Sequence, residues 1–239
     1  MFARVFFAAI AAGLAAGLLI SLLQSLTTTP LIRAAEVYET AAPAEHRHIG
    51  TEGHVHEDSH EHGAAPPLLL TVGANVVVGV GYALLLVGCL ALHGRPVDGR
   101  RGLLWGAAGF VVFVAAPSLG LPPETPGMMA ADLAARQMWW LGAAAAAGAG
   151  LWLAVFARIP LAVPLGIAIA LVPHLVGAPE AVGEGGAVPP ELAARFAVTA
   201  IAVGAAFWVV LGWVAGTIYG RFRSPAIDHG GQSRTMVEE

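Results

Sequence analysis

No lysine occurs in this sequence, and all twelve basic residues are arginines. A phosphate-binding P-loop needs a lysine ammonium on the nucleotide phosphates, so the chain carries no nucleotide site of that kind. The arginines are scattered and the formal net charge is −4, which leaves no basic stripe to neutralise a nucleic-acid backbone. We therefore expect neither a nucleotide nor a nucleic acid as a partner.

Cysteine is almost absent. Cys89 is the only one in the chain, so no intrachain disulfide can form. It lies within an apolar run, and we interpret it as a small packing or lipid-facing residue.

Charge is scarce, whereas apolar residues are abundant. Charged residues make up 12% of the chain and hydrophobic residues 57%, with a mean hydropathy of +0.72, against roughly 25% charged residues in ordinary soluble domains. Runs of about 20 uncharged residues are what a bilayer about 30 Å thick requires. We predict an all-α polytopic transmembrane bundle, a single membrane domain over residues 1–239, surrounded by lipid.

Six apolar runs are candidate spans. The fifth is the weakest because three prolines interrupt it, so five spans remain the alternative. The first is longer than the apolar core of a signal peptide, so we expect a retained helix. The runs are Val5 to Leu23, Leu68 to Leu92, Gly102 to Leu121, Met138 to Ala157, Pro160 to Ala178 and Phe196 to Ile218.

Arginine placement predicts the orientation, because short cytoplasmic loops accumulate basic residues. With six spans and the N-terminus inside, eight arginines fall in the cytoplasm and four outside, while twelve of the sixteen acids fall outside. We expect a bacterial inner-membrane protein with both termini cytoplasmic and a short cytoplasmic tail over residues 221–239. The outer arginines are Arg33, Arg47, Arg136 and Arg195.

Small residues four apart let helix backbones approach closely in lipid. Three glycine pairs have this spacing, and we assign them to helix packing rather than to a site: Gly13 with Gly17, Gly102 with Gly106, and Gly212 with Gly216.

The predicted outer loop, residues 27–67, is rich in histidine and acids. It holds six of the nine histidines as three H-x-H pairs, and imidazole is the commonest protein ligand for transition metals. Histidine-rich tracts of this kind bind metals, although a solvated loop without a ligand role is the alternative. The histidines are His46, His48, His54, His56, His60 and His62.

A zinc-hydrolase pattern, H-E-x-x-H, also occurs between His56 and His60. That chemistry needs a helix to bring both imidazoles onto one face. The surrounding glycines and prolines form helices poorly, so we expect no enzymatic activity. A metalloenzyme would instead lose hydrolytic activity in the variant Glu57→Gln.

A histidine and an asparagine lie inside predicted spans, where ionisable and polar groups are costly and often functional. His174 follows Pro173 near the outer end of the fifth run, and it is a candidate metal ligand or a histidine bonded to a nearby carbonyl. Asn75 in the second run is interpreted as an interhelical hydrogen-bonding residue, with a residue of the transport pathway as the alternative.

Four carboxylates lie at the predicted outer mouth. Glu36 and Glu39 follow the first span, and Glu124 and Asp132 lie between the third and fourth. They are candidate metal ligands or ordinary turn and interface residues. We expect Arg136 to pair with an acid such as Asp132, four residues earlier.

The chain resembles the CbtA family of cobalt transporter subunits. The matching segments run in one order along nearly the whole chain and include Ala35-Glu36-Val37-Tyr38-Glu39, Ala116-Pro117-Ser118-Leu119-Gly120-Leu121-Pro122-Pro123-Glu124 and Pro173-His174-Leu175-Val176-Gly177-Ala178-Pro179. The resemblance implies cobalt uptake alongside a small single-span CbtB subunit, and about five spans.

Residue chemistry and resemblance together predict a membrane subunit for uptake of a divalent transition metal, cobalt(II) or another, as substrate and with no tightly bound cofactor. The residues alone cannot select cobalt, because nickel and copper bind the same nitrogens more strongly. The alternative is a membrane scaffold that binds or senses metal without transporting it.

Overall fold

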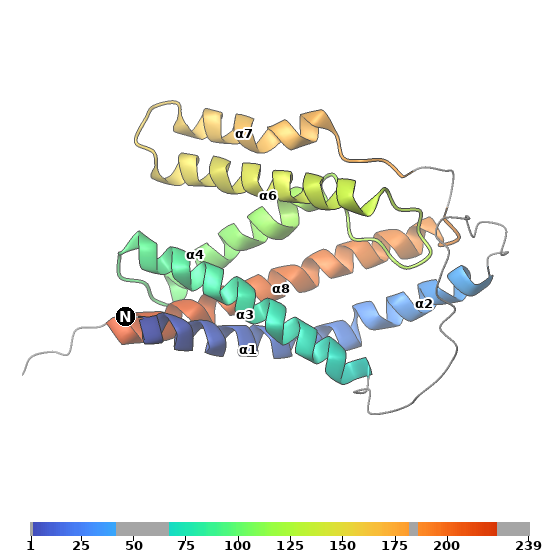
Figure 1. The fold of residues 1–239 in the computed structure, drawn as a ribbon, viewed down its shortest axis with the longest axis horizontal. Coiled ribbons are helices and arrows are strands. Elements are labelled where there is room, and N and C mark those ends of the chain that lie inside the picture. The colour runs from blue at the N-terminus through green and yellow to red at the C-terminus, as the bar shows by residue number, and fades with distance from the viewer. Residues whose placement is uncertain (1, 42–66, 182–185, 224–239) are drawn as a thin grey trace, which may run out of the picture.

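The computed structural model describes residues 2–41, 67–181 and 186–223, and every regular element in these ranges is helical. The predicted all-α bundle is confirmed (Figure 1). In chain order the elements are α1 (Phe2–Leu26), α2 (Thr28–Ala41), α3 (Pro67–His93), α4 (Gly99–Phe110), the π-helical η2 (Val111–Ala115), α5 (Ala116–Ser118), α6 (Leu133–Phe156), α7 (Ala162–Val176) and α8 (Pro190–Arg223).

Five helical segments in the described residues are long and apolar enough to cross a membrane: Ala3–Leu26, Leu68–His93, Gly99–Ser118, Leu133–Phe156 and Pro190–Phe222. They coincide with five of the six predicted runs. The remaining run forms α7, whose 15 residues extend only about 22 Å, less than the hydrocarbon core.

Helix α7 nevertheless runs back beside α6 (Figure 1). The backbones of Gly150, in the last part of α6, and Gly166, in the first part of α7, meet, since a Cβ on Gly166 would lie 2.4 Å from the Gly150 carbonyl oxygen. Near the end of α7, the ring of His174 contacts Trp139, close to the start of α6. The two helices therefore form an antiparallel hairpin.

The ends of the first and last helices meet. Arg4 Nη1 donates a hydrogen bond of 2.7 Å to the carbonyl oxygen of Phe222. Helices α1 and α8 can start and finish at one end of the bundle only if the chain traverses it an even number of times. The path therefore has six passes, of which α7 is the short one.

Close glycine contacts join the helices, as predicted. A Cβ on Gly13 would lie 2.4 Å from Val80 Cα of α3, and a Cβ on Gly102 would lie 2.2 Å from the Gly212 carbonyl oxygen of α8. Gly106 of α4 and Gly216 of α8 lie at the same close contact between these two helices. In lipid, where burial of apolar surface cannot drive association between helices, this close packing stabilises the bundle.

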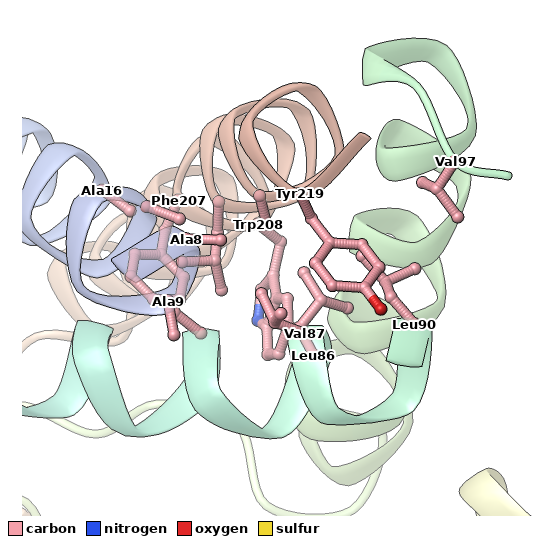
Figure 2. Close-up of a cluster of buried hydrophobic side chains, with 14 residues drawn as sticks. Ala8, Ala9, Ala16, Leu86, Val87, Leu90, Val97, Phe207, Trp208 and Tyr219 are labelled. Atoms are coloured by element: carbon pink, nitrogen blue, oxygen red, sulfur yellow. The ribbon is translucent and has the colours of Figure 1, made fainter. Parts of the chain in front are cut away.

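The main core lies where α1, α3 and α8 meet, and Figure 2 shows its central side chains. Trp208 and Leu211 of α8 are buried against Val87 and Leu90 of α3. Alanines of α1 complete the cluster and keep that helix close. These helices, with α4 packed on α8, form the larger part of the bundle.

The α6–α7 hairpin joins this larger part chiefly through η2 and α5. Pro117 has no backbone N–H to donate, and the Ala116 N–H bonds to the carbonyl five residues back, at Val111. The helix is therefore wider here. Valines of η2 reach both neighbours: Val112 lies beside Gly148 of α6 and Val114 beside Gly204 of α8.

Beyond the membrane-length segments, α2 packs along the start of α8 (Figure 1). Helix α8 has 34 residues and is about 51 Å long, well over the bilayer core. The first part of the predicted 27–67 loop is thus the helix α2, which sequence reasoning did not foresee. We call this end of the bundle the α2 end.

Candidate functional site

A pocket of about 510 Å³ lies at the α2 end, where the segment after α5 meets the start of α6 and the end of α7. Two predicted metal ligands line it, Glu124 and His174, although 50 residues separate them in the sequence. Further lining residues are Leu119, Gly120, Leu121, Pro122, Trp139, Ala178, Pro179, Glu180 and Ala181.

Trp139 holds three segments of the pocket together. Its Nε1 donates a hydrogen bond of 3.2 Å to the Pro173 carbonyl oxygen, and its ring meets the His174 ring edge-on, with centroids 5.5 Å apart. A Cβ on Gly120 would lie 2.3 Å from Trp139 Cη2, so only glycine fits there. The indole thus fixes the position of His174 beside the segment that leads to Glu124.

His174 is half-buried at the end of α7. Pro173 removes one backbone donor inside this helix, and the Pro173 carbonyl accepts from both Trp139 and the backbone N–H of Gly177. The histidine therefore sits on a helix end that is fixed by hydrogen bonds from two directions.

Glu124 forms an ion pair with Arg136: Nη2 and Oε2 are 2.7 Å apart. Arg136 thus pairs with an acid, as expected, but with Glu124 rather than Asp132. Asp132 is the N-cap of α6, and its Oδ1 accepts a hydrogen bond of 2.9 Å from the Ala135 backbone N–H. A capping aspartate faces the helix end, so the guanidinium reaches the proline-rich segment instead.

The other candidate ligands lie away from the pocket. Glu36 and Glu39 are exposed on α2, and the Glu39 Cβ is 3.2 Å from where a Cβ on Gly127 would lie. The six loop histidines and the tail beyond Arg223 fall outside the described residues, so their predicted roles stay predictions.

Sequence reasoning missed Glu180. This glutamate lines the pocket with Glu124 and His174, and its only signal was its place just after the Pro173 to Pro179 segment. Among the residues that the structure describes, no three His, Cys, Asp or Glu side chains gather closely enough to hold a metal ion. The pocket therefore offers separate ligands rather than a finished coordination shell.

Asn75 has the interhelical role predicted for it. Its Nδ2 donates to Ser21 Oγ at 3.0 Å and to Gln24 Oε1 at 2.7 Å, both on α1. The amide thus joins α1 to α3 beside the Gly13–Gly17 contact, and it lines no part of the pocket.

The helices, the apolar surfaces and the polar pocket at one end define a polytopic helical membrane protein. The family model described as "Probable cobalt transporter subunit (CbtA)" matches residues 2–220. The chain belongs to the CbtA family. No curated protein and no solved structure matches the chain.

Proposed function

We propose that this chain is the membrane subunit through which a divalent transition metal, cobalt(II) in the first place, enters the cell. The histidine-rich segment binds the ion outside the cell. The pocket between α5, α6 and α7 is then the first metal-binding site that the ion reaches within the membrane domain. The observation that carries this proposal is the convergence of Glu124 and His174 on one pocket.

The chemistry of the pocket supports a divalent metal. An imidazole and two carboxylates are a mixed nitrogen and oxygen ligand set that suits first-row transition metals. The loose arrangement of these groups suits transport, because a site must bind well enough to admit the ion and weakly enough to release it. Water and neighbouring ligands complete the shell in this proposal.

Orientation and partners form part of the same proposal. The α2 end faces outward in a bacterial inner membrane, and the end with both termini faces the cytoplasm. The membrane potential, a co-transported ion or a partner supplies the energy. The family description names a subunit, and we propose a small single-span protein of the CbtB type as its partner.

The test is cobalt uptake into proteoliposomes that contain the full-length chain, with its partner subunit where one is required. His174→Ala should abolish uptake at every cobalt concentration, because packing fixes this imidazole and no neighbour can replace it. Trp139→Phe is a second variant for comparison: it keeps an aromatic ring at this position and leaves the imidazole in place, but removes the indole N–H and reduces the size of the ring. Normal uptake by a folded His174→Ala protein would place the site elsewhere.

Two further measurements test which metal is preferred and whether the chain transports it. Nickel and zinc as competitors identify the preferred metal. Cells that lack the gene should accumulate less cobalt from a medium with limiting metal, whereas unchanged accumulation would favour the non-transporting scaffold.

A further inference from the structure

One of the proposed metal ligands, Glu124, is also a partner in an ion pair. Glu124 lines the pocket, and its carboxylate also contacts the Arg136 guanidinium at 2.7 Å. The two side chains are only 21% and 30% exposed, so water screens their attraction incompletely. A carboxylate that neutralises an arginine is a weaker ligand for an incoming cation.

The two partners are fixed to different degrees. Glu124 lies among Pro122, Pro123 and Pro126, whose rings restrict the backbone, and the next residue, Thr125, is buried. Arg136 instead has a long flexible side chain, and its Nε is buried without a hydrogen-bond partner in the described part of the chain. A long side chain has many rotamers, so the arginine is the partner that moves more easily.

The position of Arg136 needs an explanation of its own. It is in the first turn of α6, next to the Asp132 cap, where the partial positive charge of a helix N-terminus disfavours a cation. Among the described residues its single ion pair is the one with Glu124. The guanidinium therefore lies here because of that carboxylate.

We propose that Arg136 is a tethered competitor for the metal: it occupies Glu124 when the pocket is empty and is displaced when a divalent cation binds. This inference rests on the proposed function. Arg136 then lowers the affinity of the pocket and favours release of the ion toward the cytoplasm.

The experiment uses the full-length chain in lipid nanodiscs, with the six loop histidines replaced by alanine so that calorimetric titration with cobalt(II) reports the pocket. Arg136→Gln should tighten binding about tenfold, because the metal no longer has to break the ion pair, and a hydrogen bond between charged groups is worth about one factor of ten in affinity. In vesicles the same variant should lower both the half-saturating concentration and the maximal rate of uptake.

Glu124→Gln is the matched control, because it breaks the same ion pair without freeing a carboxylate. It should weaken binding, and the double variant with Arg136→Gln should show no gain. Arg136→Met, uncharged and of similar length, replaces Arg136→Gln if the latter fails to fold and should show the same gain.

The outcomes separate the two proposals. If the parent binds cobalt, His174→Ala abolishes binding and neither Arg136 variant tightens it, the competitor proposal is overturned while the pocket stands. If the parent and the Arg136 variants bind no cobalt, both proposals fall. Equal loss of affinity in Arg136→Gln and Glu124→Gln would make the ion pair a structural support for the site.

Discussion

Single residues at the α2 end show both the reach and the limits of sequence reasoning. His174 and Glu124 were candidates from their types and predicted depth, and they line one pocket. Arg136 pairs with an acid as predicted, but the example Asp132 was not the one, because the rule for residues four apart on a helix ignores capping: Asp132 accepts a hydrogen bond from the Ala135 N–H. The Glu124 contact depends on how a proline-rich segment folds back, which no local rule gives.

The loop histidines lead to a prediction at this scale. Replacing His46, His48, His54, His56, His60 and His62 with alanine should weaken metal binding by the purified protein, since six imidazoles are removed. Uptake at saturating metal should be largely retained, because the pocket is intact. Calorimetry and vesicle uptake measure the two effects.

The pH dependence of capture provides the internal control. Imidazole binds metal only when neutral, so binding by the unchanged loop should fade as the pH falls through about 6.5. In the alanine variant the loop's share of this pH dependence should be lost. Equal binding by both proteins would show that the histidines do not act as ligands.

At the scale of helices, composition predicted the elements well and their partners poorly. Uncharged runs of membrane length identified five spans, and glycines four apart identified faces that pack closely. The sequence did not show which helix faces pack against each other. Gly102 of α4, for example, meets Gly212 of α8, more than 100 residues later. Helix α2 was missed because its polar residues resembled a loop, although it packs along α8.

The glycine contacts predict a difference between two otherwise similar substitutions. Gly102→Ala places a methyl group 2.2 Å from the Gly212 carbonyl oxygen, so α4 and α8 must separate, at a cost of about 1–3 kcal/mol. We expect a lower unfolding temperature of the purified protein in detergent. A wild-type unfolding temperature would mean that these backbones are farther apart than described.

Gly81→Ala is the matched control. Gly81 lies within α3, and a Cβ there would meet nothing within 4 Å. Alanine favours helix more than glycine does, so the unfolding temperature should stay the same or rise slightly. A similar loss in both variants would point to helix propensity rather than contact.

At the scale of the whole molecule, the number of crossings depends on α7. Its 15 residues are too few for an average bilayer, but mismatch of this size is accommodated by local thinning or by flanking residues. The apolar Ile159, Pro160 and Leu161 precede it. Because α7 packs against α6, it has a membrane-length partner beside it.

Six crossings make a prediction that five do not. Reporters fused after Glu239, within residues 95–101 or next to Arg158 should all report the cytoplasm, and reporters near Gly53 or in residues 182–185 should report the outside. Two comparisons between reporters distinguish six crossings from five. The first compares Arg158 with residues 182–185, on either side of α7, and the second compares residues 182–185 with Glu239, on either side of α8.

If α7 entered the membrane without crossing it, the reporters at Arg158 and at 182–185 would agree. The last helix would then carry the C-terminus to the side opposite the N-terminus. That result would contradict the Arg4–Phe222 hydrogen bond, which brings the two helix ends together. It would also move His174 and Glu180 away from the side of the histidine-rich segment, so capture and pocket could no longer act in series.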